Sequence, residues 1–146
     1  MKVHSANTNI KATPEKIWTI LTDAPNYPKW DPWATRIEGN IVAGGKVTAY
    51  TKLSPDRAFP VTVTEFKPGR KMTWTGGMPL GLFKGVREFV LDPKKDGSVD
   101  FTVKEVFSGP LLPMFAGSLP DMTQPFQDFV DGLKARAEGS KWSGPD

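Results

Sequence analysis

A long amphipathic segment near the C-terminus limits the possible folds more than any other stretch of the chain. Within residues 119–138, apolar side chains recur at steps of three and four, which is the spacing of one wide helical face. The apolar stripe comprises Phe115, Leu119, Met122, Phe126, Phe129, Val130, Leu133 and Ala137. Nearly all of the preceding chain reads as strands, so the stripe predicts a helix that covers the apolar face of an open sheet.

Three bulky side chains, Met122, Phe126 and Phe129, occupy the middle of this stripe. They suit either a packed core or the adaptable wall of a pocket, and the pattern does not choose between the two. Pro125 lies among them and has no N–H to donate to a helical hydrogen bond. It therefore predicts either a kink or the true start of the helix.

The residue types that the chain lacks exclude several kinds of chemistry. Its 146 residues contain no cysteine and a single histidine, His4. Disulfides, thiolate nucleophiles, Cys-ligated metals and a two-histidine metal site within one chain are therefore excluded. His4 lies near a chain end with no evident partner, and we expect it to be solvated or packed in a strand rather than to act as a base. No metal site or cofactor is predicted.

Length and charge indicate one soluble domain. We place it at residues 1–138 and expect residues 139–146, which show no periodicity, to be disordered. The net charge is +3, but the basic residues are scattered and do not interleave with stacking aromatics, so no nucleic-acid binding is expected. The chain shows no signal segment and no apolar run long enough to span a membrane, which predicts a cytoplasmic protein.

The N-terminal third predicts a strand followed by two short helices or turns. Residues 2–12 alternate weakly, as in a strand, and Thr13 and Pro14 then provide the cap and the first position of a short helix. That helix should end before Pro25. The stretch from there to Trp33 is rich in proline and predicts a second short helix or turn, with Asp31 as a polar anchor.

The middle of the chain predicts an antiparallel meander. Alternating polar and apolar residues occur in residues 33–38, 46–53, 59–66, 71–76, 82–91 and 99–107. Short turn sequences connect these stretches, so that successive strands should be antiparallel neighbours. The side chains expected to face the helix are Trp33, Thr35 and Ile37; Val47, Ala49, Thr51 and Leu53; Phe59, Val61 and Val63; Met72 and Trp74; Phe83, Gly85, Arg87, Phe89 and Leu91; Val99, Phe101, Val103, Glu105 and Phe107.

Two charged residues, Arg87 and Glu105, belong to this inward set. A register that pairs Phe89 with Phe101 places them one diagonal step apart, within reach of each other. They are either an ion pair that serves only the structure, or a donor and an acceptor that bind the polar end of an apolar ligand in a cavity. Both interpretations remain open at this point.

Several short motifs resemble the polyketide cyclase-like branch of the START and Bet v 1-like (SRPBCC) superfamily. They are Ile10-x-Ala12-x-Pro14-x-x-Ile17-Trp18-x-x-Leu21-x-Asp23, Tyr27-Pro28-x-Trp30-Asp31-Pro32, Phe66-x-Pro68-Gly69-Arg70-x-Met72-x-Trp74-x-Gly76, Phe89-x-Leu91-x-Pro93 and Glu105-x-Phe107-Ser108-Gly109. The resemblance implies an α+β helix-grip fold. Such a fold has two short N-terminal helices, a curved antiparallel sheet of six or seven strands, and a long C-terminal helix over the concave face.

The resemblance further implies a cavity between sheet and helix that holds a small hydrophobic or amphipathic molecule. The residues expected to contact that ligand are Trp33, Trp74, Arg87, Phe89, Glu105, Phe107, Met122, Phe126 and Phe129. The alternatives are a polyketide cyclase- or dehydratase-like enzyme and an interaction module with a filled core. The histidine usual in such pockets is absent at Arg87 and Val103, so catalysis stays uncertain. The oligomeric state, for which a homodimer is one option, is not determined.

Two loops are apolar where loops are normally polar. Residues 77–83 and 109–115 should emerge at the same end of the sheet. We expect them either to line and gate the mouth of the cavity or simply to fold over the end of the helix.

Overall fold

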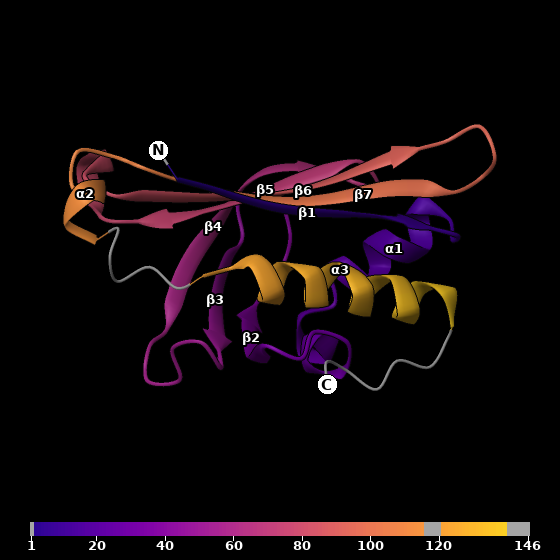
Figure 1. Ribbon diagram of the computed structural model, residues 1–146, viewed down its shortest axis with the longest axis horizontal. Helices are drawn as coiled ribbons and strands as arrows, with labels where there is room; N and C mark the ends of the chain where they lie inside the picture. Colours follow the sequence, from indigo (N-terminus) through magenta and orange to yellow (C-terminus); the bar gives the residue numbers. More distant parts are fainter. Residues whose placement is uncertain (1, 116–120, 140–146) are drawn as a thin grey trace.

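The fold consists of a curved antiparallel sheet with one long helix packed against its concave face (Figure 1). The computed structural model describes residues 2–115 and 121–139. In these residues the sheet has seven strands in the order β1-β7-β6-β5-β4-β3-β2. The strands are β1 (Lys2–Ile10), β2 (Ala34–Gly39), β3 (Lys46–Thr51), β4 (Phe59–Lys67), β5 (Lys71–Gly77), β6 (Lys84–Pro93) and β7 (Val99–Ser108). The predicted α+β helix-grip class is confirmed.

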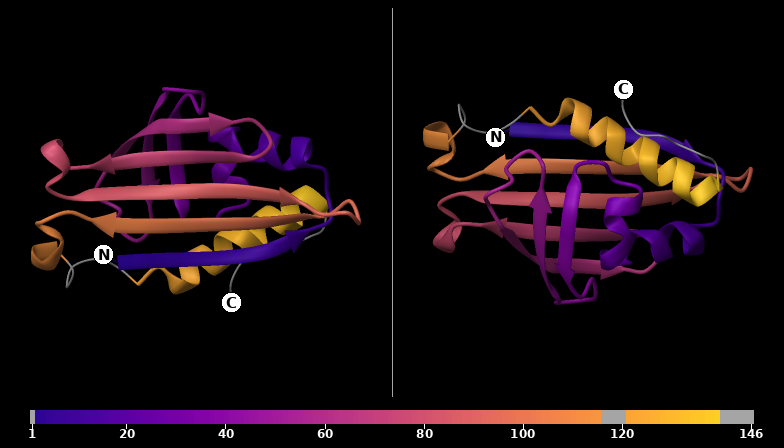
Figure 2. Two further views of the ribbon diagram at one scale, coloured as in Figure 1. Left: turned by 90° about the horizontal axis from the view of Figure 1, so that it is seen from above. Right: turned by 90° about the horizontal axis from the view of Figure 1, so that it is seen from below.

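Successive strands from β2 to β7 are antiparallel neighbours, as the short turns predict. The first strand is not part of this meander, because β1 pairs with β7 at the far edge of the sheet. Figure 2 shows that β2 and β3 turn under the rest of the sheet, so the sheet wraps round its own concave face. This curvature creates an interior that one helix has to fill.

The two short N-terminal helices form where the sequence predicts them. Helix α1 (Pro14–Leu21) begins after Thr13, whose side chain accepts a hydrogen bond from Lys16 N at 3.2 Å, and proline takes its first position. The proline-rich stretch forms the 3-10 helix η1 (Ala24–Lys29). The remaining short elements are η2 (Pro79–Gly81) and α2 (Leu112–Phe115).

Helix α3 (Thr123–Glu138) lies across the concave face and packs mainly against β1. Asp121 Oδ1 accepts a hydrogen bond from Thr123 N at 3.0 Å at its start. Pro125 is the third residue of α3. The first backbone N–H groups of a helix have no acceptor within the helix, so a proline at this position costs no hydrogen bond. Pro125 therefore marks the start of the helix rather than a kink. The predicted start at Leu119 and the tail from residue 140 lie outside the described residues.

Two members of the predicted inward-facing set are exposed in the structure. The register shifts between Ala34 and Arg36, so that Ala34 and Ile37 are buried whereas Thr35, predicted to face inward, is exposed. Phe59 was also predicted to face inward, and at the start of β4 it remains exposed. The other inward residues of β3 to β7 are buried or half-buried, as alternation predicts.

Candidate functional site

Arg87 and Glu105 lie directly opposite each other on β6 and β7, and Arg87 Nε donates to Glu105 Oε2 at 2.6 Å. The predicted diagonal register is wrong, because Phe89 pairs with Val103 rather than with Phe101. The reason is the β6–β7 turn. Asp96 accepts hydrogen bonds from the backbone and the side chain of Ser98, which produces a longer turn and moves the register by two residues.

The register extends this pair into a row across four strands of the concave face. His4 on β1 lies opposite Glu105, and Trp74 on β5 lies opposite Arg87. We call His4, Glu105, Arg87 and Trp74 the polar row. Both end members carry a buried ring nitrogen, His4 Nε2 and Trp74 Nε1, that has no hydrogen-bond partner in the described part of the chain. Buried polar atoms are normally paired, so these two require an explanation.

His4 is the functional candidate that sequence reasoning missed. His4 has the same strand parity as Ala6, Thr8 and Ile10, and Ile10 is completely buried, so this parity corresponds to the inward face of β1. That parity was the available signal. Parity alone does not identify His4 as a site residue, because the sequence does not show that β1 pairs with β7. This pairing brings His4 beside Glu105.

Phe126 of α3 covers the polar row from the helix side. The Cζ atom of Arg87 is 5.1 Å from the centre of the Phe126 ring, which is a cation–π distance. The imidazole of His4 lies edge-on to Phe126 at 6.4 Å and to Phe107 at 6.5 Å between ring centres. Aromatic faces therefore border a set of polar groups, which is the composition of a small-molecule site.

Inward-facing side chains are completely buried in the middle of the sheet and only partly buried toward one end. The partly buried end is where the interior is open. Phe89, Phe101 and Val103 are completely buried near the middle of the sheet. Toward the end where residues 77–83 and 109–115 connect the strands, which we call the loop end, inward-facing residues are only half-buried. The Arg87 and Glu105 side chains are 26% and 14% exposed although they face the interior. Solvent therefore reaches this part of the concave face.

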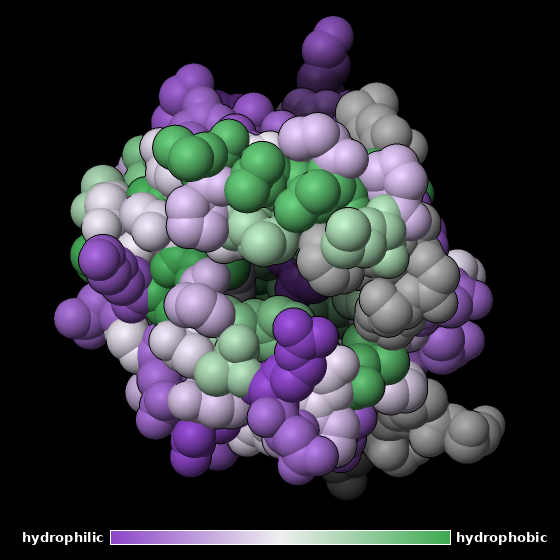
Figure 3. Space-filling model, turned by 90° about the vertical axis from the view of Figure 1, so that its left-hand side faces the viewer, coloured by the Kyte–Doolittle hydropathy of each residue, from purple (hydrophilic) through white to green (hydrophobic). Residues whose placement is uncertain are grey.

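The space at the loop end, which we call the hollow, lies beside the half-buried, inward-facing pairs Gly85/Phe107 and Arg87/Glu105 of β6 and β7. Figure 3 views this end of the molecule and shows a depression with apolar side chains around part of its rim and hydrophilic atoms at depth. Two glycines, Gly76 and Gly85, pair with each other at this end of the sheet. A Cβ atom on Gly85 would lie 3.2 Å from the Phe107 ring.

The other half of the interior is filled by aromatic rings. The ring centres of Trp74 and Phe89 are 4.8 Å apart, those of Phe89 and Phe129 5.9 Å, and those of Trp30 and Phe129 5.0 Å. Tyr27 closes this cluster, and burial raises the pKa of its hydroxyl, which donates to the carbonyl of Leu21. This half of the interior is occupied by packed aromatic side chains, whereas the hollow lies at the loop end (Figure 3).

The structure places the nine predicted ligand residues in different parts of the interior. Arg87, Glu105, Phe107 and Phe126 come together at the hollow, and Trp74 lies opposite Arg87 with its ring against Phe89 of the aromatic cluster. Phe89 and Phe129 belong to the aromatic cluster, and Met122 is buried directly before α3. Trp33 is engaged elsewhere, because its Nε1 donates to Asp128 Oδ2 at 2.8 Å.

Asp31 is a buried carboxylate behind the site. Burial, partly opposed by hydrogen bonds from the backbone of Trp33 and Ala34 and by the charge of Arg87, raises its pKa to about 6. Its Oδ1 accepts from Trp33 N at 3.1 Å, in agreement with the predicted polar anchor. Asp31 is therefore a group whose charge changes close to neutral pH.

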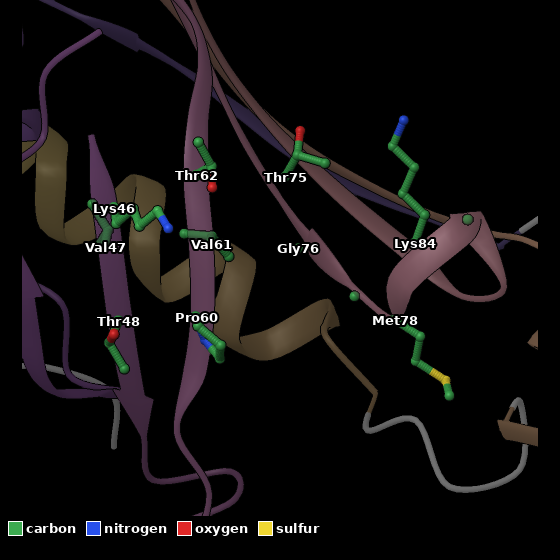
Figure 4. Close-up of a pocket in the computed structure, with 12 residues that line it drawn as sticks. Lys46, Val47, Thr48, Pro60, Val61, Thr62, Thr75, Gly76, Met78 and Lys84 are labelled. Carbon is green, nitrogen blue, oxygen red and sulfur yellow. The ribbon is translucent and has the colours of Figure 1, made fainter. Parts of the chain in front are cut away.

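A separate pocket of about 560 Å³ lies where β4 and β5 diverge (Figure 4). Its walls come from β3, β4, β5, η2 and the start of β6, and Lys46, Lys84 and Met78 lie among its lining residues. None of the nine predicted ligand residues lines it. Val61, which alternation predicts to face inward, is among the residues that line this pocket.

The sequence matches one protein family from residue 2 to residue 138, namely "Polyketide cyclase / dehydrase and lipid transport". The chain belongs to this family. No curated protein matches the sequence. Residues 2–115 and 121–139 contain no helix of the length and apolar character needed to cross a membrane, and no group of three or more His, Cys, Asp or Glu side chains that could hold a metal ion.

Solved structures share the family fold at low sequence identity. A START superfamily protein from Mycobacterium smegmatis is 17% identical with a TM-score of 0.67, and 94% of this chain and 97% of that chain are covered. The Aha1 dimer from Colwellia psychrerythraea is 22% identical with a TM-score of 0.72, over 97% and 100% of the two chains. The di-domain ARO/CYC protein BexL from the BE-7585A biosynthetic pathway is 9% identical with a TM-score of 0.68, over 94% of this chain and 47% of that chain. At these identities the likeness concerns the fold alone.

Proposed function

We propose that this family member binds a small amphipathic molecule in the hollow, with the apolar body of the guest against Phe107 and Phe126 and its polar end at the polar row. The observation that carries the proposal is a set of charged and polar groups inside an otherwise apolar concavity, where two ring nitrogens have no hydrogen-bond partner among the described residues. A buried polar atom without a partner is costly, and a guest atom or an ordered water would satisfy it.

The donors of the polar row select the chemistry of the guest. Trp74 Nε1 can only donate, and Arg87 has further N–H groups beyond the one that bonds Glu105. An oxygen acceptor such as a carbonyl, hydroxyl or carboxylate oxygen suits both. His4 Nε2 either accepts or donates, which suits a hydroxyl group on the same molecule.

The size of the free space favours a guest that occupies only part of the interior. The aromatic cluster around Phe129 fills one half, so the guest extends from the polar row toward the loop end. The family description includes lipid transport, and structural neighbours include a START superfamily protein. Both support an apolar or amphipathic guest and leave its identity open.

A second candidate function is an enzyme of the cyclase or dehydratase type. The observation that favours it is the placement of His4 opposite Glu105 at the hollow, because an imidazole and a carboxylate are the usual groups for moving a proton to or from a bound substrate. The family description and the neighbour BexL support the same chemistry. In this case Glu105→Gln should abolish turnover of a polyketide substrate while guest binding persists.

Binding is tested by native mass spectrometry of the purified full chain and by titration with a fluorescent fatty-acid probe. Trp74→Phe keeps an aromatic ring and removes the Nε1 donor. This variant should bind the probe with about tenfold lower affinity. Trp30→Phe is the matched control, because Trp30 Nε1 is also buried without a partner in the described residues, but Trp30 does not belong to the polar row. Absence of both a retained molecule and probe binding would overturn the proposal and favour an interaction module with a filled core.

A further inference from the structure

Four exposed apolar side chains gather on the two loops at the loop end. Leu80 is 96% exposed and Met114 72%, and Met78 and Leu82 are 41% and 37% exposed. We call these four residues the apolar tip. Large apolar side chains are rarely exposed together, and such a group usually marks a contact surface.

Hydrogen bonds unite the two loops into one surface. Leu111 N donates to the carbonyl of Leu82 at 2.9 Å, which joins residues 109–115 to residues 77–83. Met78 N donates to the carbonyl of Phe83 at 2.8 Å and closes the first loop. At its apex Leu80 has φ 62°, a left-handed conformation that is unfavourable for leucine, and this conformation holds its side chain in solvent. Folding of the protein itself gains nothing from that arrangement.

The charges around the apolar tip are basic. The sequence contains no charged residue between Lys71 and Lys84 or between Glu105 and Asp121, so both loops are free of carboxylates. Lys46 and Lys84 border the pocket beside Met78 (Figure 4), and neither forms an ion pair within residues 2–115 and 121–139. Asp121 lies on the other side, near Lys2. An apolar tip flanked by unpaired lysines is complementary to an anionic lipid surface.

We propose that the apolar tip docks the protein on the surface of an anionic phospholipid bilayer, with Leu80 and Met114 inserted among the lipids and Lys46 and Lys84 at the headgroups. A bilayer fits better than a protein partner. The tip is exposed and built from leucine and methionine, and its four residues include none of the tyrosine, tryptophan and arginine anchors that dominate protein interfaces. The hollow opens at the same end, so docking would let an apolar guest enter without crossing water. Only this last consequence rests on the proposed function.

The test is co-sedimentation of the full chain with vesicles of phosphatidylcholine, with or without phosphatidylserine, and without added guest. The wild type should bind the anionic vesicles, and binding should weaken as salt is raised. The double variant Leu80→Asn/Met114→Gln should bind about tenfold more weakly, because two apolar insertions are lost. Asparagine tolerates the left-handed conformation, so this variant should keep the thermal stability of the wild type.

Matched controls separate the tip from general surface effects. Lys46→Gln/Lys84→Gln should reduce binding to anionic vesicles only, whereas Lys95→Gln, in the turn at the opposite end of β6, should not. Val42→Asn removes another half-exposed apolar side chain away from the tip and should also bind as the wild type does. The proposal fails if the wild type does not bind anionic vesicles, if the tip variant binds equally well, or if Val42→Asn lowers binding to the same extent. Fatty-acid probe titration, performed without vesicles, tests guest binding independently.

Discussion

The indole Nε1 of Trp33 donates a hydrogen bond of 2.8 Å to Oδ2 of Asp128, and this bond connects the segment before β2 to helix α3. Asp128 is buried, and its other oxygen accepts from Gln124 Nε2 at 2.7 Å. The helix is therefore fixed to the curled part of the sheet through a charged acceptor. Hydrogen bonds to charged groups contribute more than neutral ones.

Trp33→Phe should lower the free energy of unfolding by about 2 kcal/mol more than Trp30→Phe does. Both changes remove a similar volume, but only Trp33 loses a bonded donor, since Trp30 Nε1 has no partner in the described residues. Urea unfolding of the two variants gives the difference. Equal losses would show that the Trp33–Asp128 bond contributes nothing measurable.

Asp31→Asn should change how stability depends on pH. The folded pKa of Asp31 is about 6, above the ordinary value of 3.8, so the charged carboxylate is unfavourable in the folded protein. The contribution of Asp31 is fully present below about pH 4 and is lost as the pH rises through 6, by about 3 kcal/mol in total.

Asparagine at this position keeps an acceptor for Trp33 N and cannot ionise. Relative to the wild type, Asp31→Asn should therefore gain stability between pH 4 and pH 7, as measured by urea unfolding at each pH. Several other carboxyl groups have lowered pKa values and also make stability depend on pH. Their contribution is the same in the wild type and the variant, so it cancels when the two proteins are compared at the same pH. A constant difference across the range would contradict the raised pKa.

The Arg87–Glu105 pair should show strong coupling. Arg87→Met leaves Glu105 as a charge inside an apolar concavity, and Glu105→Met leaves the guanidinium there, so each single change should cost about 2 kcal/mol of stability. The double change should cost less than the sum, because no charge is then left unpaired. A double-mutant cycle in urea measures this, and additive losses would contradict the pairing.

The two facing glycines should respond differently to alanine. In Gly85→Ala the added methyl lies 3.2 Å from Phe107, a half-exposed ring that can shift, so the hollow narrows and probe affinity should fall about threefold with little loss of stability. In Gly76→Ala the methyl lies 2.8 Å from the backbone oxygen of Pro60, which cannot yield. That variant should lose about 2 kcal/mol of stability. Probe titration and thermal unfolding of both variants distinguish the outcomes.

The end of helix α3 is tied to the end of β1 by Glu138. Its Oε2 accepts from Lys11 N at 2.8 Å and from Lys134 Nζ at 2.8 Å, and these bonds lower the pKa of the carboxyl group. The stabilisation is present above the ordinary pKa of glutamate and is lost as the pH falls through the lowered value. Glu138→Ala should cost about 1 kcal/mol at pH 7 and nothing in strong acid, where the wild type has lost the same contribution.

Much of the site's composition could be read from strand alternation. Alternation placed Arg87 and Glu105 on the inward faces of neighbouring strands, and it placed Trp74 on the same face. It could not give the register, since a register depends on the turn, and the hydrogen bonds of Asp96 to Ser98 lengthened that turn. It also could not show that Thr35 would be turned outward, because a bulge follows from the pairing of β2 with β3.

The sequence by itself determined the class of fold, because the period of two in the middle of the chain and the period of three to four at its end allow few arrangements other than a sheet covered by a helix. Only the tertiary structure decided what the interior contains. Long-range pairing of β1 with β7 brought His4 to Glu105, and α3 leaned on β1, so that one half of the interior was filled by aromatic rings and the other remained open. The physical reason is that periodicity reports which face a residue occupies, whereas space and contact depend on how far the sheet curves and on which strands become neighbours.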